Sequence, residues 1–122
     1  MPKLIEHQTH SDKRGNLTVL EDHHIPFSIK RIFYIYGVDD SQRGGHRHHK
    51  TKQALMCVTG SCRIDCDNGK EKTSFLLDHP KKCLIVEPEE WHVMNNFSED
   101  TVLLVLASEY YDHADYIFEA YD

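Results

Sequence analysis

Cys62–Leu77 reads CRIDCDNGKEKTSFLL, and its alternation of apolar and polar side chains decides the fold class. Cys62, Ile64 and Cys66 lie on one face of an extended strand, because side chains alternate sides with period 2. The Asp-Asn-Gly that follows at 67–69 stands between two alternating runs, which predicts a β-hairpin. The stretch therefore indicates antiparallel β-structure with one buried face.

Alternating runs of the same kind recur along the chain, separated by turn-forming residues. The expected strands are Leu17–Glu21, Ile29–Tyr36, Gly45–His49, Ala54–Thr59, Cys62–Cys66, Thr73–Leu77, Cys83–Val86, His92–Asn96 and Val102–Ala107. So many short strands must close into a barrel or stack as two sheets to protect their edges. We therefore expect an all-β, antiparallel jelly-roll barrel in a single domain, residues 1–122, with a candidate helix in the tail Glu109–Ala120.

Composition and charge narrow the class of protein. The chain has 122 residues, 39% hydrophobic and 28% charged, with a formal net charge of -6, which is typical of one soluble globular domain. Nucleic-acid-binding domains usually carry a basic overall charge, so the acidic charge of this chain argues against nucleic-acid binding. No apolar run approaches the roughly 20 residues of a membrane span or resembles a secretory signal, which favours the cytoplasm. The four cysteines match no CxxC pattern and are interpreted as reduced, buried residues.

One segment, Arg43–Lys52, reverses the charge of the chain. It reads RGGHRHHKTK and holds three histidines and several cations without one acid, which indicates an anionic ligand beside imidazole chemistry. His46 and His48 stand two apart, so on a strand both imidazoles leave the same face. Such a pair can bind a metal or move protons.

These residues resemble the cupin family. His46-x-His48 is followed by Gln53 and Gly60, and Pro88 leads through His92 to Asn96, in the order of the cupin pattern. Metal-binding cupins place glutamate where Gln53 stands. A neutral amide is a weaker ligand for hard metal ions than a carboxylate.

The chain is more similar to one branch, the nucleotide-sugar 3,4-ketoisomerases that act on dTDP-4-keto-6-deoxyglucose. The similar segments are Ile25–Arg31, Arg43–His48, Gln53, Gly60–Arg63, Trp91–His92, Asn96–Ser98, Val105–Ser108, Tyr110–Asp112 and Asp115–Ile117. Several of them, such as the Arg-Gly-x-His-x-His core, are not demanded by a generic cupin barrel. His49 departs from the lysine that is usual in this family.

The resemblance implies a metal-free and cofactor-free isomerase that moves the ketone from carbon 4 to carbon 3 of the hexose through an enediolate. It implies that His46 and His48 transfer the protons, with His46 favoured as the base and His48 as the relay. The expected substrate-binding residues are Arg43, Tyr34, Arg31, Gln53, Trp91 and His92. Arg31 and Tyr34 differ in strand parity, so only one of them can face the barrel interior.

Two other functions remain open at this point. One is a metal-dependent cupin dioxygenase or isomerase with His46, His48, Gln53 and His92 as ligands; the other is a sugar-binding cupin without catalysis. Within the ketoisomerase interpretation, the galacto or gluco product and the thymidine or uridine base stay open. The resemblance further implies a homodimer with exchanged amino-terminal strands over Met1–Leu20, and a role in making 3-amino-3,6-dideoxyhexoses for a surface glycan.

Overall fold

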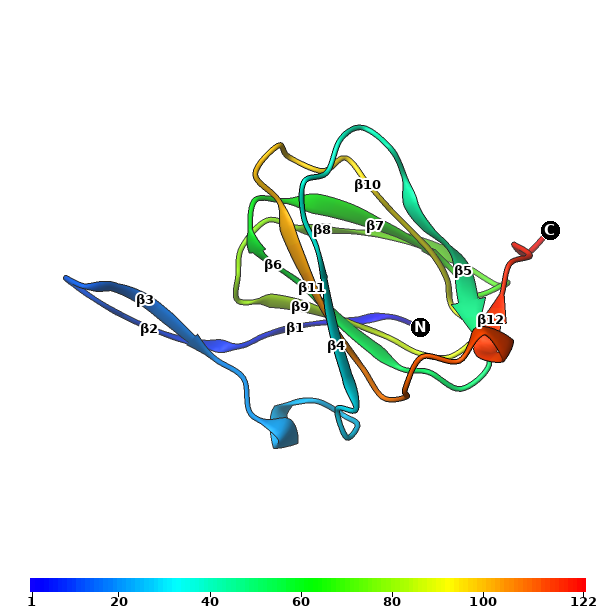
Figure 1. Cartoon of the computed structure of the whole chain (residues 1–122), viewed down its shortest axis with the longest axis horizontal. Helices are drawn as coiled ribbons and strands as arrows, with labels where there is room; N and C mark the ends of the chain where they lie inside the picture. Colours follow the sequence, from blue (N-terminus) through cyan, green and yellow to red (C-terminus); the bar gives the residue numbers. More distant parts are fainter.

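The computed structural model describes all residues, 1–122, as two five-stranded antiparallel sheets that face each other, with a small separate hairpin (Figure 1). The strands are β1 (Lys3–Glu6), β2 (Gln8–Asp12), β3 (Gly15–Val19), β4 (Arg31–Ile35), β5 (Arg43–His48), β6 (Gln53–Thr59), β7 (Cys62–Asp67), β8 (Lys72–Leu77), β9 (Lys82–Val86), β10 (Trp91–Asn95), β11 (Val102–Ala107) and β12 (Tyr116–Ile117). The first sheet has the order β1-β9-β6-β11-β4 and the second has the order β12-β5-β10-β7-β8. The all-β, antiparallel expectation is confirmed.

The hairpin predicted at residues 67–69 joins β7 to β8. The two strands pair from Cys62 opposite Leu77 to Asp67 opposite Lys72. The Asp67 carboxylate accepts a hydrogen bond from the Gly69 amide at 2.8 Å, and Gly69 has φ 88°, a conformation that glycine adopts without steric cost. Local turn chemistry therefore fixes the register of this pair, and the register sends the apolar set of β7 inward.

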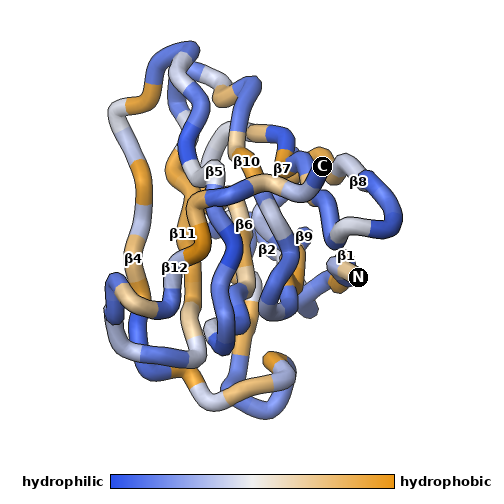
Figure 2. The backbone as a smooth tube through the Cα atoms, turned by 90° about the vertical axis from the view of Figure 1, so that its right-hand side faces the viewer, coloured by the Kyte–Doolittle hydropathy of each residue, from blue (hydrophilic) through white to orange (hydrophobic).

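The core lies between the two sheets and is built from inward-facing residues of both. Its largest cluster consists of Leu55, Cys57, Cys62, Ile64, Cys66, Leu77, Leu84, Val86, Met94, Leu103 and Val105. Figure 2 shows strong hydrophobic colouring along β11, which lies between β6 and β4 and contributes Leu103 and Val105. All four cysteines are free and buried, which agrees with their interpretation as small apolar core residues.

A second apolar cluster covers the outer face of the first sheet. Ile25, Ala54, Met56, Cys83, Ile85 and Leu106 form it, and Phe27 and Ile29 pack against it from the segment that precedes β4. That segment includes a single 3-10 turn, η1 (Asp22–His24). The cover ends at β4, whose outward residues Ile32 and Tyr34 stay 59% and 61% exposed.

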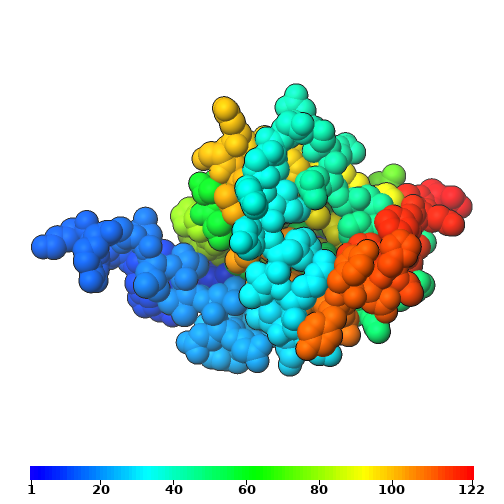
Figure 3. All heavy atoms as spheres, in the orientation of Figure 1, coloured from blue at the N-terminus to red at the C-terminus, as the bar shows by residue number.

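The β2–β3 hairpin extends away from the barrel and is the blue projection of Figures 1 and 3. Its two strands pair with each other, from Gln8 opposite Val19 to Asp12 opposite Gly15, and with no other strand. The carboxyl-terminal segment lies over the other side of the barrel beside β5.

The nine expected strands are all present, with boundaries that differ by at most two residues. β1, β2 and β12 were not expected as separate strands. The candidate helix over Glu109–Ala120 is wrong, because the tail instead forms one 3-10 turn, η2 (His113–Asp115), and the short strand β12. Pairing of β12 with β5 supplies the backbone hydrogen bonds that a helix would otherwise satisfy internally. No helix here is long or apolar enough to cross a bilayer.

Truncation of a core side chain should destabilise the fold strongly. Leu103 is 0% exposed in the core between the sheets, so we expect Leu103→Ala to lower the free energy of unfolding by about 2 to 5 kcal/mol. Leu76→Ala is the matched control, since Leu76 is 53% exposed on the outer face of β8. Urea denaturation measures both, and equal effects would contradict the placement of the core.

Candidate active site

Three histidines from two strands of the second sheet converge inside the barrel. His46 and His48 come from β5 and His92 comes from the neighbouring β10, where it pairs directly with His46. One ring nitrogen from each histidine lies within 4.8 Å of those of the other two. The prediction that His46 and His48 share a face is confirmed, and the sheet register adds His92 to them.

A β-bulge between His92 and Val93 sets this register. Gly44 and Gly45, on the neighbouring strand β5, have φ of 82° and 75°, a backbone conformation that residues with a side chain rarely adopt. A Cβ at Gly44 would lie 2.9 Å from the carbonyl oxygen of His92, too close for any other residue. The two glycines therefore have a structural role, which is to bring His46 level with His92.

His48 is held by a buried carboxylate. Its Nδ1 lies 3.1 Å from Oδ2 of Asp115, and the two residues are 3% and 4% exposed. Asp115 also accepts a hydrogen bond from the Thr51 hydroxyl and one from the Lys50 amide at 2.8 Å. These bonds fix the His48 ring with its Nε2 buried and free of a protein partner.

Sequence reasoning missed the role of Asp115. In the sequence Asp115 was singled out only as part of the Asp115–Ile117 segment of the family resemblance. It lies 67 residues after His48 in the chain, so no spacing argument connects the two. The pairing of β12 with β5, Tyr116 opposite His48, brings the two ends together. Tyr116 was missed in the same way, and its ring centroid lies 4.8 Å from that of His46 and 4.4 Å from that of His48.

Burial keeps all three imidazoles neutral. Burial, with the neighbouring His48 next, lowers the pKa of His46 to about 4. For His92 burial and the neighbouring His46 lower the pKa to about 3. Burial also lowers the pKa of His48, although the hydrogen bond and charge of Asp115 act in the opposite direction. Each ring is thus a free base near neutral pH.

Asp115 itself remains ionised. Burial opposes its charge, but hydrogen bonds from Thr51, the Lys50 backbone and His48 outweigh burial and lower the pKa of this carboxyl. An ionised carboxylate beside Nδ1 favours the tautomer with the proton on Nδ1, which leaves the Nε2 lone pair of His48 pointing into the site.

Arg31 is the cation that the structure brings to the histidines. It lies on the inward face of β4, where its guanidinium stacks 4.7 Å from the Phe33 ring and 5.3 Å from the Tyr111 ring. Its positive charge lowers the pKa of both His46 and His48, as expected of a neighbouring cation. The parity of β4 is therefore settled in favour of Arg31.

Tyr34 lies on the opposite face of β4 and does not line the barrel interior, contrary to the expectation. Its ring stacks 5.9 Å from that of Tyr36, and both are exposed. A strand has two faces, and the inward one is taken by Arg31, Phe33 and Ile35.

Gln53 lies on the wall that faces the histidines. It pairs with Ala107 of β11, which pairs in turn with Arg31 of β4, so the three residues form one inward-facing row across the first sheet. Gln53 is 2% exposed and its Oε1 has no protein partner. A buried amide oxygen without a partner is available to a ligand.

Arg43 lies toward the other end of β5, opposite Met94, two positions along β10 from His92. It is exposed and lines a surface pocket with Tyr36 and Asp39 rather than the histidine cluster. The structure therefore does not bring Arg43 together with His46 and His48.

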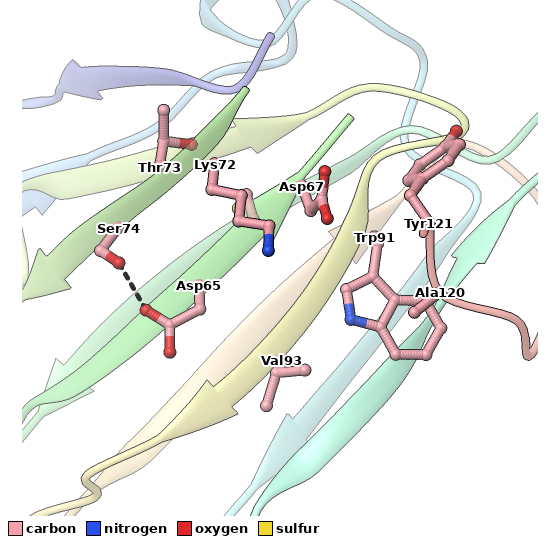
Figure 4. Close-up of a pocket in the computed structure, with 10 residues that line it drawn as sticks. Asp65, Asp67, Lys72, Thr73, Ser74, Trp91, Val93, Ala120 and Tyr121 are labelled. Carbon is pink, nitrogen blue, oxygen red and sulfur yellow. Dashed lines mark hydrogen bonds between the residues drawn. The ribbon is translucent and has the colours of Figure 1, made fainter. Parts of the chain in front are cut away.

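Trp91 is also separated from the histidines, because it precedes His92 and leaves the other face of β10. It lines an outer pocket of about 390 Å³ together with Tyr121, Asp65 and Lys72 (Figure 4). Tyr121 donates a hydrogen bond to the Glu89 carbonyl at 2.7 Å and closes one side of this pocket. Of the eight expected site residues, the barrel interior thus gathers His46, His48, His92, Arg31 and Gln53.

The buried histidines should make stability depend on pH. The pKa of His92 is 6.5 in the unfolded chain and about 3 in the folded chain. Between these pH values only the unfolded chain takes up a proton at His92, so the free energy of unfolding is highest above pH 6.5 and falls as the pH falls from 6.5 toward 3. We expect His92 to lower the free energy of unfolding by up to about 1.4 kcal/mol for each pH unit below 6.5. Urea denaturation between pH 7.5 and 5 would show a shallower dependence in His92→Gln and an unchanged one in His10→Gln, which replaces an exposed histidine. Equal slopes in the wild type and His92→Gln would contradict the burial.

Three comparisons place the chain among known proteins. A family model described as FdtA: WxcM-like, C-terminal matches residues 1–122. A TDP-4-oxo-6-deoxy-alpha-D-glucose-3,4-oxoisomerase of Aneurinibacillus thermoaerophilus is 45% identical over 117 residues, which cover 94% of this chain and 84% of that protein.

Solved structures agree. A crystal structure of a mutant of the 3,4-ketoisomerase QdtA from Thermoanaerobacterium thermosaccharolyticum, in complex with TDP-4-keto-6-deoxyglucose, is 43% identical with a TM-score of 0.93, over 97% of this chain and 87% of that one. A 3,4-ketoisomerase from Helicobacter canadensis is 39% identical with a TM-score of 0.93, over 97% and 90%. With its jelly-roll fold, its buried histidines and these matches, the chain belongs to the FdtA (WxcM-like, C-terminal) family of sugar 3,4-ketoisomerases.

Proposed function

We propose that this isomerase converts TDP-4-keto-6-deoxyglucose to the 3-keto-6-deoxyhexose. The observation that carries the proposal is the pair of neutral histidines, half-buried His46 and buried His48 held by Asp115, in a chain that is 45% identical to a TDP-4-oxo-6-deoxyglucose 3,4-oxoisomerase. Movement of a ketone to the neighbouring carbon needs a base that removes a carbon-bound proton and an acid that returns one. Neutral imidazoles serve both needs.

In the proposed mechanism His48 removes the proton from carbon 3. The electron pair of the broken C–H bond forms the carbon 3–carbon 4 double bond, and the carbon 4 carbonyl becomes the enediolate oxygen. A proton then returns to carbon 4, while the hydroxyl proton of carbon 3 passes to the carbon 4 oxygen, which becomes a hydroxyl, and the carbon 3 oxygen becomes the new ketone. One C–H bond breaks and one forms, so the reaction needs no oxidant or cofactor.

Asp115 supports His48 rather than His46 as the base, the reverse of the assignment that the resemblance favoured. Asp115 raises the basicity of His48, whereas no carboxylate contacts His46, whose pKa lies at about 4. His46 is half-buried and adjoins His48, with ring centroids 5.0 Å apart, which suits a relay between the two sugar oxygens.

Two further groups support binding of the sugar. The Arg31 guanidinium supplies positive charge near the histidines, which suits the enediolate oxygen or the diphosphate. The free Oε1 of Gln53 suits a sugar hydroxyl. We assign Arg43 and Trp91, which lie outside the histidine cluster, no part in the proton transfer.

Proton NMR of the protein with TDP-4-keto-6-deoxyglucose in deuterated water tests the proposal. Formation of a 3-keto sugar with deuterium at carbon 4 is the expected result. Unchanged substrate, with protein that still binds TDP in a calorimetric titration, would contradict the activity and would favour a sugar-binding role. Because a 3-ketone is what an amino-transfer enzyme converts to a 3-amino sugar, we place the reaction in the synthesis of 3-amino-3,6-dideoxyhexoses for a surface glycan.

We propose that the chain is a single domain, residues 1–122, that acts in the cytoplasm as a homodimer. One core shared by both sheets supports the single domain, and four free cysteines suit a reducing compartment. The dimer is supported by an uncovered edge strand, since β4 ends the first sheet, exposes Ile32 and Tyr34 at 59% and 61%, and is followed directly by Tyr36, which is 69% exposed. The projecting β2–β3 hairpin has the reach to lie on a second copy (Figure 3).

Light scattering should give the mass of two chains at micromolar concentration. We expect Tyr34→Asp to shift the mass toward one chain, because it places a charge on the proposed contact surface. Leu76→Asp is the control, since it introduces the same charge on an exposed residue of β8 in the other sheet. A wild-type protein with the mass of one chain would contradict the dimer.

A further inference from the structure

The outer face of the second sheet carries a pocket that the proton transfers above leave unused. Its floor is made of outward-facing residues in two rows across β10, β7 and β8: Trp91, Asp67 and Lys72 in one row, and Val93, Asp65 and Ser74 in the other. Because side chains alternate sides along a strand, this floor lies on the opposite face of the sheet from His92. The pocket is therefore separate from the histidine cluster.

Tyr121, which closes one side of this pocket, is held from three directions. Its hydroxyl donates to the Glu89 carbonyl oxygen at 2.7 Å, and the centre of its ring lies 3.8 Å from Cζ of Arg47. Gly69 leaves room for the ring, since a Cβ there would lie 3.0 Å from it. The stacking leaves Nε of Arg47 buried without a hydrogen-bond partner, which costs free energy. The wall is thus a fixed part of the structure, and its retention calls for a function.

Asp67 and Lys72 bring an acceptor and a donor to the pocket from neighbouring strands. Oδ1 of Asp67 accepts a hydrogen bond from the Gly69 amide, which leaves Oδ2 available. Lys72 is exposed, and its side chain extends from β8 across β7 in the direction of Trp91 (Figure 4). A ligand above the indole ring can therefore reach a carboxylate oxygen and an ammonium group together.

The charge of the second carboxylate, Asp65, is already compensated. Arg63 pairs with it at 3.1 Å, and Ser74 and Asn95 donate hydrogen bonds to it at 2.6 Å and 2.7 Å. The pocket is consequently close to neutral. A diphosphate would meet two carboxylates there against one ammonium, so the pocket does not suit a nucleotide.

The chemistry of the pocket fits a neutral hexopyranose. One face of a pyranose ring consists of C–H groups that pack on an indole ring, and its rim of hydroxyls both donates and accepts hydrogen bonds. One hydroxyl can donate to Asp67 while its neighbour accepts from Lys72, and such charge-assisted bonds are the stronger ones. A wholly apolar ligand would instead take both charges out of water without a partner. The volume of about 390 Å³ is typical of small-molecule sites.

We propose that this outer pocket is a carbohydrate-binding site for a neutral hexopyranose that carries no nucleotide, either a free sugar or the end of a glycan chain. Trp91 supplies the stacking surface, and Asp67 and Lys72 orient the ring through its hydroxyls. The proposal does not depend on the isomerase activity, because none of these residues belongs to the histidine cluster.

The experiment uses the fluorescence of Trp91, which is the single tryptophan of the chain and so reports on this pocket alone. We expect a saturable change in emission with glucose, galactose or a 6-deoxyhexose, in the millimolar range of affinity that a ligand of this size allows. Lys72→Met should weaken binding by about 10-fold, because it removes a charge-assisted hydrogen bond and keeps the apolar stem of the side chain. Stronger binding of an oligosaccharide than of its terminal sugar would identify a glycan end as the ligand, and equal binding would identify the free sugar.

Lys70→Met is the matched control, since Lys70 is exposed in the turn between β7 and β8 and does not line the pocket. It should keep the wild-type affinity, and both variants should unfold at the wild-type urea concentration. Unchanged emission and no heat of binding with every hexose, equal affinities of the wild type and Lys72→Met, or displacement of the sugar by TDP would overturn the site. A response to choline in place of the hexoses would also overturn it, because it would indicate a cation site formed by the indole and the carboxylates.

Discussion

Replacement of His48 by asparagine should lower kcat for ketone transfer by about 10²- to 10⁴-fold, the range expected for loss of a positioned acid–base group. Asparagine has a similar hydrogen-bonding shape at Asp115 but no lone pair of comparable basicity at the position of Nε2. The substitution should lower both kcat and the rate at which deuterium enters at carbon 4, whereas the affinity for TDP should stay unchanged.

Proton NMR in deuterated water and calorimetric binding of TDP measure the two quantities in parallel. His79→Asn is the matched control, since it makes the same substitution at an exposed histidine. Deuterium incorporation by His48→Asn at the wild-type rate would exclude His48 as the base. If His46→Asn alone abolished incorporation, the base would be His46, as the resemblance favours.

Replacement of Asp115 by asparagine should lower kcat by about 10²-fold while the chain stays folded. The amide of the introduced side chain can donate to Nδ1 of His48 and thereby hold the proton on Nε2, the tautomer that cannot accept a proton from carbon. In the fraction with the correct tautomer, loss of the carboxylate lowers the pKa of His48, because Asp115 raises it. The acid limb of kcat/KM should therefore move to lower pH while the maximum falls.

Thr51→Val separates this electrostatic role from a structural one. Thr51 donates a hydrogen bond to Asp115 and makes no hydrogen bond to the His48 ring, so its loss disturbs the anchor and leaves the carboxylate in place. We expect a small effect on kcat and no shift of the pH profile. An equal loss in Thr51→Val and in Asp115→Asn, with an unmoved acid limb, would show that Asp115 serves stability alone.

Local pattern determined most of the fold in advance. The period-2 alternation of β7 and the Asp-Asn-Gly turn predicted a hairpin that the structure contains with its apolar face inward. The structure of the tail was predicted wrongly, because the backbone of β12 forms its hydrogen bonds with β5, a strand far away in the chain. No local signal identifies a two-residue strand whose stability comes entirely from a distant neighbour.

The residues of the site likewise fall into those that the sequence predicts and those that only the tertiary structure identifies. Spacing alone placed His46 and His48 on one face, since a strand repeats every two residues. Spacing could not choose between Arg31 and Tyr34, which depends on the face of β4 that the core covers, nor separate Arg43 and Trp91 from the histidines. The amino-acid sequence by itself determined the strands, the turn and the histidine pair, because these follow from short-range stereochemistry. The tertiary structure decided that His92 and Asp115 join the pair and that Arg31 is its cation, because contacts between distant strands depend on register and on which face is buried.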